Sequence, residues 1–284
     1  MNLKTLTQNT VAKLEKAGID SREAALESEI LLDFIFGTTK KDLILNPDKI
    51  LPEEKLKKFD SLIKRRIKEK IPVQYLTNKA YFMGEEFYVD ENVLIPRPET
   101  ELLVANVLGL IDTPELKVLD IGTGSGCIAC MLSKFFNKST IYACDISEKA
   151  LKVAKLNAKK LGLENKITFI KSDIFEKIEK NIKFDAIVSN PPYIPLNEKA
   201  CLQPEVAIHE PHQALFVPDE LGVSFYEKLA LEAKNRLAKN GFVAVEIGIN
   251  QSACVSEIFK ANGFGKIRII QDYAGIDRIV IAKF

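Results

Sequence analysis

The tetrad Asn190-Pro191-Pro192-Tyr193 places a side-chain amide, two rigid residues and an aromatic ring next to one another. Neither proline has a backbone N–H and each fixes its own φ, so a strand must stop here and leave its carbonyl groups without a sheet partner. The Asn190 side-chain oxygen and the Pro191 carbonyl can each accept one N–H. The tetrad therefore favours a site for a planar group carrying NH2, with Tyr193 covering its face. A rigid loop capped by Asn190 is the simpler alternative.

A glycine-rich segment, Gly122-Thr123-Gly124-Ser125-Gly126, lets backbone approach a ligand closely at the start of a helix. Asp145 follows about twenty residues later, where an acid can accept both ribose hydroxyls, an arrangement that suits NAD and S-adenosylmethionine alike. The spacing is Gly-x-Gly-x-Gly, and Cys127 stands where a dinucleotide site has its third glycine. Together with Asp173 and the tetrad, this spacing favours S-adenosylmethionine over an ordinary tight turn.

The elements that position these residues are indicated by short apolar runs, typical of strands buried on both faces. Ala186-Ile187-Val188 leads into the tetrad, and Val118-Leu119-Asp120-Ile121 leads into the glycine segment. Further strands are expected at 141–145, 167–170 and 242–247, with a closing pair at 267–270 and 278–282, and helices from Cys127 and after Ser147. This alternation predicts an α/β fold, a doubly wound sheet that binds ligands at the carboxyl ends of its strands.

Residues 1–72 are predicted to form a small helical bundle in front of this domain, because their apolar residues recur at helical spacing and must be buried against one another. Gly18 ends the first helix, Ser21 caps the second, residues 40–45 form the third, and Pro52 is the first residue of the fourth. A basic cluster at 64–70 can be interpreted as an RNA contact or as a solvated helix face.

Residues 73–95 are predicted to hold a β-hairpin that turns near Gly84-Glu85 and links the bundle to a second domain at 96–284. Pro98 fits the start of a helix, and Glu99 suits the positive end of that helix's dipole. Arg97, directly before it, can be a functional cation or a partner in a surface salt bridge, and the sequence leaves both interpretations open.

Composition argues against several functional classes. The 284 residues include 40 Lys and Arg against 39 Asp and Glu, a formal net charge of +1, which counts against direct action on nucleic acid. No apolar run reaches the roughly 18 residues that span a membrane, and the first residues lack the apolar core of a signal peptide. The odd count of five cysteines fits reduced thiols, so we expect a cytoplasmic protein.

Cys127 and Cys130 have the spacing of a redox pair or of half a zinc site. No second cysteine pair follows, and His209 and His212 do not have a spacing that completes such a site. We therefore expect no metal and interpret both cysteines as packing residues on the buried side of a helix.

These motifs resemble those of the protein-(glutamine-N5) methyltransferases that act on peptide chain release factors. The resemblance covers nearly the whole chain, is weakest in the helical front end, and is densest at 72–76, 94–101, 120–129, 189–194, 246–248 and 275–278. The string Ile95-Pro96-Arg97-Pro98-Glu99-Thr100-Glu101 is specific to this group among methyltransferases. The Asn-Pro-Pro-Tyr tetrad is shared more widely, including by DNA adenine methyltransferases.

The resemblance implies a class I, Rossmann-like methyltransferase domain that uses S-adenosylmethionine, releases S-adenosylhomocysteine and methylates the glutamine of a release factor's Gly-Gly-Gln tripeptide. The front bundle would help to dock the release factor, and we expect a monomer. The glycine segment would hold the methionine end of the cofactor, Asp145 its ribose, and Asp173 with Ile174 its adenine. The implied cofactor residues are Gly122, Thr123, Gly124, Ser125, Gly126, Asp145, Asp173, Ile174 and Asn190. The implied catalytic residues are Asn190, Pro191, Pro192 and Tyr193, in a substrate pocket walled by Phe82, Arg97, Pro98, Glu99 and Thr100.

Two departures from the family pattern are visible. Asn78 stands where such sequences usually have glycine, and Asn tolerates a positive φ. The segment Phe216-Val217-Pro218-Asp219 replaces a Gly-Gly turn, which leaves the shape of that loop open. Two rival functions are a different methyl acceptor, either a ribosomal protein's glutamine or adenine in nucleic acid, and a non-catalytic module that senses the cofactor.

Overall fold

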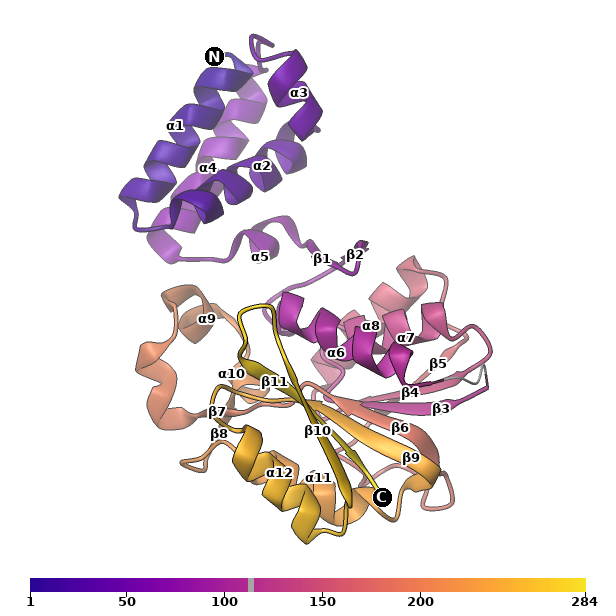
Figure 1. Ribbon diagram of the computed structural model, residues 1–284. Helices are drawn as coiled ribbons and strands as arrows, with labels where there is room; N and C mark the ends of the chain where they lie inside the picture. The colour runs from indigo at the N-terminus through magenta and orange to yellow at the C-terminus, as the bar shows by residue number, and fades with distance from the viewer. Residues whose placement is uncertain (112–114) are drawn as a thin grey trace. The chain divides into compact units, whose positions relative to one another are not determined.

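The computed structural model describes residues 1–111 and 115–284 and divides into two compact units (Figure 1). The first unit comprises Met1–Asn78 together with the inserted stretch Gln203–His209, and the second comprises Lys79–Leu202 and Glu210–Phe284. The predicted fold class is confirmed, because a helical N-terminal part precedes an α/β part whose central sheet is mostly parallel.

The first unit is helical, and its helices lie close to their predicted positions. Asp20, not Ser21, caps the second helix: its side chain accepts from the Arg22 and Glu23 amides, and Ser21 is already helical. Pro52 precedes the fourth helix rather than opening it. The helices are α1 (Leu3–Lys16), α2 (Ser21–Phe36), α3 (Lys40–Leu45), α4 (Glu53–Glu69), α5 (Val73–Thr77) and, from the inserted stretch, α9 (Pro204–His209).

A buried ion cluster ties α9 to this unit. Arg66 of α4 is 1% exposed, and its guanidinium lies 2.8 Å from Glu27 Oε2 of α2 and 2.7 Å from Glu205 Oε1 of α9. His209 Nε2 also lies 2.6 Å from the Glu69 carbonyl oxygen. One member of the basic cluster at 64–70 is therefore an internal ion-pair partner, not part of a surface available to RNA.

The second unit begins with a hairpin of β1 (Ala80–Phe82) and β2 (Glu85–Phe87). Phe82 pairs with Glu85, so the two turn residues are Met83 and Gly84, one position earlier than predicted. Both have positive φ, 49° and 81°, as the common two-residue hairpin turn requires.

A seven-stranded sheet forms the centre of the second unit, in the order β10-β11-β9-β6-β3-β4-β5. Neighbouring strands among β9, β6, β3, β4 and β5 are parallel, whereas β11 is antiparallel to both of its neighbours. The strands are β3 (Lys117–Ile121), β4 (Thr140–Asp145), β5 (Ile167–Lys171), β6 (Phe184–Ser189), β9 (Leu237–Glu246), β10 (Lys266–Gln271) and β11 (Asp277–Lys283).

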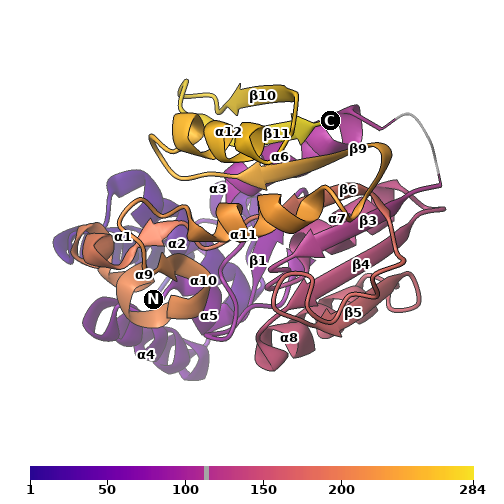
Figure 2. The ribbon, with the colours of Figure 1, turned by 90° about the horizontal axis from the view of Figure 1, so that it is seen from below.

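Helices cover both faces of this sheet. Figure 1 shows α6 (Pro98–Gly109), α7 (Cys127–Phe135) and α8 (Glu148–Lys160) on one face. The helices α11 (Ser224–Ala233) and α12 (Ser252–Ala261) lie on the other face, which is toward the viewer in Figure 2. Each face buries its own apolar cluster. Cys127, Cys130 and Cys144 are free thiols within these clusters, consistent with the packing interpretation.

Short elements connect β6 to α11. They are β7 (Ile194–Pro195), the 3-10 helix η1 (Leu196–Cys201), α9, α10 (His212–Leu215) and β8 (Phe216–Val217). β8 pairs in parallel with β7, so the first two residues of the segment that replaces the Gly-Gly turn form a short strand beside the residues that follow the tetrad. Asn78 has φ 53°, which confirms that asparagine adopts the left-handed conformation there.

Candidate functional site

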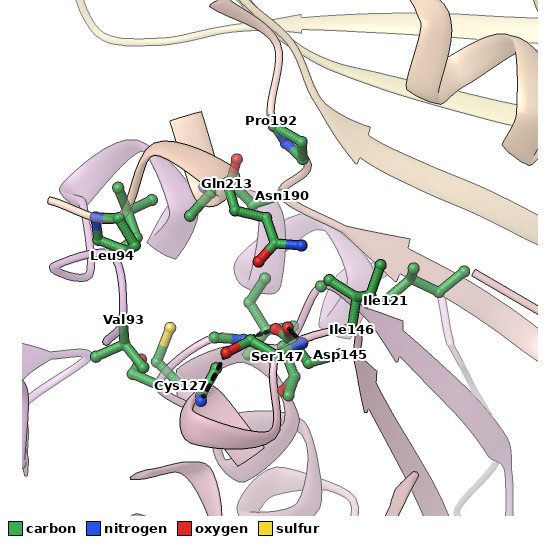
Figure 3. Close-up of a pocket in the computed structure, with 18 of the residues that line it drawn as sticks. Val93, Leu94, Ile121, Cys127, Asp145, Ile146, Ser147, Asn190, Pro192 and Gln213 are labelled. Atoms are coloured by element: carbon green, nitrogen blue, oxygen red, sulfur yellow. Dashed lines mark hydrogen bonds between the residues drawn. The ribbon is translucent and has the colours of Figure 1, made fainter. Parts of the chain in front are cut away.

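The glycine segment, Asp145 and the tetrad lie at the ends of three strands that stop at the same level of the sheet. Ile121 of β3 is in register with Cys144 of β4 and with Ser189 of β6. The residues that follow these strands surround a cavity of about 260 Å³ (Figure 3). In that view Asn190, Pro192 and Gln213 lie toward one end, and Asp145, Ser147 and Cys127 toward the other.

The glycine segment forms the wall of the cavity nearest β3. The amides of Gly122 and Thr123 both donate to the Cys144 carbonyl, at 2.9 and 3.0 Å, which turns the chain out of the sheet. Gly122, Thr123, Gly124 and Ser125 line the cavity, but Gly126 does not. A Cβ on Gly126 would lie 3.0 Å from the Ala154 Cβ, so this glycine allows the loop to approach α8 closely.

Asp145 lies at the end of β4 and is held in place by backbone amides. Gly124 donates to its Oδ2 at 2.9 Å and Ser147 to its Oδ1 at 2.8 Å. Burial raises the pKa of this carboxyl, and the two amide bonds act in the opposite direction. Each carboxylate oxygen keeps a further lone pair, so the side chain can still accept two hydroxyl groups.

The segment after β5 contributes to a mostly apolar part of the cavity lining. Asp173 and Ile174 line it together with Ile146 and Phe225. Ile174 has φ 44°, an uncommon conformation for a β-branched residue, and its carbonyl accepts from Ser172 Oγ at 3.2 Å. Apolar walls beside one carboxylate suit a flat heterocycle that carries an amino group.

The tetrad contributes to the end of the cavity that lies away from Asp145 (Figure 3). Asn190 and Pro192 line the cavity, whereas Pro191 and Tyr193 are not among its lining residues. The Asn190 amide nitrogen donates to Thr100 Oγ1 at 2.9 Å, which leaves its Oδ1 available to accept an N–H. The Tyr193 hydroxyl instead lies 3.3 Å from Glu246 Oε1, and burial raises the pKa of this phenol well above its usual value.

The first turn of α6 reaches the cavity with its N-cap, Arg97, and with a residue three positions later, Thr100. Arg97 and Thr100 line it, but Pro98 and Glu99 do not. Arg97 forms an ion pair with Glu210, a carboxylate that is 3% exposed, so it is at once a cavity residue and a salt-bridge partner. Phe82 is fully buried among core residues with its ring centroid 6.1 Å from that of Phe87, so it packs beneath the hairpin rather than against the cavity.

Several residues around the site had no role in the sequence interpretation. Gln213 and Phe225 line the cavity, and Glu210 holds Arg97. Glu246 accepts from Thr100, and Gln251 donates to the Tyr193 carbonyl at 2.9 Å. Glu246 stands in one of the strings that resemble the family, but nothing local to that string shows which side chain it contacts.

The end of the cavity near Asn190 is suited to accepting N–H groups rather than to removing protons. The titratable residues among the cavity lining are Arg97, Cys127, Asp145 and Asp173. Arg97 cannot act as a base, and burial raises the pKa of the Cys127 thiol to about 12. In the described ranges, no group of three or more His, Cys, Asp or Glu is arranged to hold a metal ion, and no helix could cross a membrane.

Two family models and several curated relatives match this chain. A family model described as Methyltransferase small domain matches residues 98–215, and one described as PrmC N-terminal domain matches residues 5–77. A release factor glutamine methyltransferase from Clostridium acetobutylicum is 39% identical over 258 residues, which is 90% of either chain. Another, from Fusobacterium nucleatum, is 37% identical over 275 residues, covering 96% of this chain and 77% of the relative.

Solved structures support the fold. A methyltransferase from Pyrococcus furiosus aligns with a TM-score of 0.55 at 20% identity, covering 71% of this chain and 90% of the other. A Thermus thermophilus 16S rRNA methyltransferase, solved with AdoMet and guanosine, aligns with a TM-score of 0.52 at 17% identity, covering 72% and 49%. These likenesses concern the Rossmann-like methyltransferase architecture alone.

Proposed function

Because the chain belongs to the release factor glutamine methyltransferase family, we propose that it transfers a methyl group from S-adenosylmethionine to the side-chain amide nitrogen of the Gly-Gly-Gln glutamine in peptide chain release factors. The observation that carries this proposal is the orientation of Asn190 at the cavity. Its amide nitrogen donates to Thr100, so its oxygen is the end that can receive the N–H of a substrate amide.

The cavity lining fits S-adenosylmethionine. Gly122–Ser125 present backbone without bulky side chains, so this loop would hold the methionine end. Asp145 would accept from the ribose hydroxyls, and Asp173 with Ile174 would border the adenine. When bound, the cofactor supplies an electrophilic methyl group on a sulfonium.

The residues near Asn190 act by positioning and by electrostatics. The lone pair of an amide nitrogen is delocalised into its carbonyl, so the nitrogen is a poor nucleophile. Asn190 lines the cavity, and its Oδ1 would accept one N–H of the substrate amide, raise electron density on the nitrogen and fix its direction of attack. Pro191 does not line the cavity, so we assign no substrate contact to its carbonyl. No lining side chain is needed as a base, because the nitrogen can lose its proton to water after methylation.

A mutation tests this role. Replacing Asn190 with Ala removes the acceptor for the substrate N–H, and by analogy with the loss of one oxyanion-hole donor we expect the transfer rate to fall about a hundredfold or more. The assay is mass spectrometry of a purified release factor after incubation with enzyme and cofactor, scored as one added methyl group on the tripeptide glutamine. Asn106→Ala is the matched control, because Asn106 lies on α6, outside the cavity lining, and its amide donates to the Leu102 carbonyl of the same helix.

Three outcomes of this assay contradict the proposal. Transfer by Asn190→Ala at the wild-type rate would refute the role of Asn190. Methylation of a ribosomal protein or of adenine in place of the release factor would refute the substrate. Absence of any turnover would favour a cofactor-sensing module. We also propose that the enzyme is cytoplasmic and acts as a monomer. Light scattering of the purified protein would test the monomer, and fractionation of cells would test the location.

A further inference from the structure

We propose that Glu246, acting through Thr100, is a positioning residue that determines which end of the Asn190 amide faces the substrate. This inference rests on the proposed function, because it assigns a task to the Asn190 oxygen. A series of hydrogen bonds, here called the Glu246–Thr100–Asn190 chain, lies behind the cavity wall and joins three elements, α6, β9 and the turn after β6.

The chain consists of two short hydrogen bonds. The Asn190 amide nitrogen lies 2.9 Å from Thr100 Oγ1, and Thr100 Oγ1 lies 2.6 Å from Glu246 Oε2. Thr100 and Glu246 are each 2% exposed, so water is not available to replace either partner. Glu246 does not line the cavity and therefore cannot touch a bound substrate directly.

The direction of this chain follows from counting hydrogens. A carboxylate only accepts, and Glu246 already accepts from the Tyr193 hydroxyl on its other oxygen, at 3.3 Å. The Thr100 hydroxyl has a single hydrogen, which it donates in the hydrogen bond to Glu246. The lone pairs of Thr100 therefore face Asn190 and accept only its NH2 end. The two ends of a carboxamide have nearly the same shape, so without this chain packing alone would hardly distinguish them.

The charge of Glu246 makes the chain sensitive to pH. Burial raises the pKa of Glu246 to about 7, while hydrogen bonds from Thr100 and Tyr193 act in the opposite direction. A protonated Glu246 could donate to Thr100, whose own hydrogen would then point at Asn190 and favour the flipped amide. The titratable or charged groups around Glu246 are Glu99 on α6, Cys127 on α7, Tyr193 after β6, Tyr226 on α11 and Arg278 on β11.

The first test is the pH dependence of methyl transfer to a purified release factor. In the wild type, the rate at saturating cofactor should fall as the pH decreases through about 7. Thr100→Val keeps the shape but removes the hydroxyl, and should lower kcat by roughly 10- to 100-fold, as losses of orienting partners do elsewhere, and remove this pH step. Thr100→Ser, which keeps the hydroxyl, should restore the rate to within a few-fold. Glu246→Gln should make the rate independent of pH between 6 and 8.

Thr10→Val is the control for the chemical change itself. Thr10 is 1% exposed and its hydroxyl donates only to the Leu6 carbonyl in α1. It should therefore leave kcat and the pH profile unchanged. A merely structural role of Thr100 would predict instead that Thr100→Val lowers stability and rate while the pH profile keeps its wild-type shape, and that result would overturn the proposal.

The second test does not depend on the substrate. In nuclear magnetic resonance spectra of the free enzyme, the Asn190 NH2 signals can be assigned by their absence in Asn190→Ala. We expect slow solvent exchange of these protons in the wild type, a shift with a midpoint near pH 7, and loss of both properties in Thr100→Val. Identical Asn190 signals in the wild type, Thr100→Val and Glu246→Gln would refute the chain. If the wild type failed to methylate the release factor, the proposed function would be refuted. The spectra would still show whether the hydrogen bonds from Asn190 through Thr100 to Glu246 exist.

Discussion

Gly222 provides a sharp test of how the tetrad is held. It lies just before α11 with φ +71°, and a Cβ at this position would lie 2.2 Å from the Tyr193 carbonyl oxygen and 2.4 Å from Gln251 Nε2. Gly162, after α8, has nearly the same φ, +69°, but a Cβ there would meet nothing within 4 Å. Both glycines belong to the second unit. Gly222→Ala and Gly162→Ala therefore have the same cost of a left-handed backbone, and only Gly222→Ala brings the new methyl group into collision with neighbouring atoms.

The magnitudes can be worked out from these contacts. The left-handed conformation costs a non-glycine residue about 1–2 kcal/mol, and both variants lose this much. In Gly222→Ala the new methyl group also displaces the Gln251 amide, which donates to the carbonyls of Tyr193 and Leu221, each at 2.9 Å. Leaving such buried groups unpaired costs about 1–3 kcal/mol. We therefore expect Gly222→Ala to lose about 1–3 kcal/mol more than Gly162→Ala.

Urea unfolding of the two variants measures this difference, and methyl transfer measures its functional consequence. The Tyr193 carbonyl must move away from the new methyl group, and the turn that carries Asn190 moves with it. A displacement of about 1 Å at a reacting centre can lower a rate about a hundredfold. We expect at least a tenfold loss for Gly222→Ala and little loss for Gly162→Ala. Equal losses of stability and rate in the two variants would refute the idea that Gly222 and Gln251 position the tetrad.

Two further substitutions test the other ends of the structure. Asp145→Ala removes the carboxylate that would accept from the ribose hydroxyls. Because hydrogen bonds to charged groups contribute about 1.5–3 kcal/mol, calorimetry should show cofactor binding weakened about tenfold or more. Unchanged affinity would exclude this contact. Arg66→Met leaves Glu27 buried without its ion-pair partner, so the first unit should lose about 3–5 kcal/mol of unfolding free energy. Lys13→Met, which removes an exposed ion pair with Asp60, is its control and should lose less than about 1 kcal/mol.

The sheet and the residues at its edge could be predicted from local patterns. An apolar run in the sequence indicates each buried strand. The parallel register then brings together the residues at the ends of β3, β4 and β6. The positions of Gly122, Asp145 and Asn190 around one cavity therefore follow from strand order alone. Errors of one residue arose where two local signals competed, as at the cap Asp20-Ser21 and at the turn Met83-Gly84.

The inserted stretch shows what local patterns cannot reach. Glu205 and His209 lie in a region of short, irregular elements with no distinctive periodicity, yet they belong to the compact unit formed by the N-terminal helices. The pairing of Arg66 with Glu205 spans 139 positions. A lysine-rich or arginine-rich helix looks the same in sequence whether one of its cations is solvated or buried, because the deciding carboxylate comes from elsewhere in the chain.

The same reasoning applies with more consequence to Asn190. Sequence places its side chain at the sheet edge but does not determine which of its two ends faces the cavity, because oxygen and NH2 occupy nearly the same volume. Only hydrogen-bond partners break this symmetry, and the partner that does so, Thr100, takes its own polarity from Glu246, 146 positions away. The NH2 end of the Asn190 amide donates to Thr100, and the oxygen end is the one that can accept an N–H from the methyl acceptor. The two partners therefore bind opposite ends of the same carboxamide. Glu246, which does not line the cavity and cannot contact a bound substrate, thus determines which end of the Asn190 amide faces the cavity.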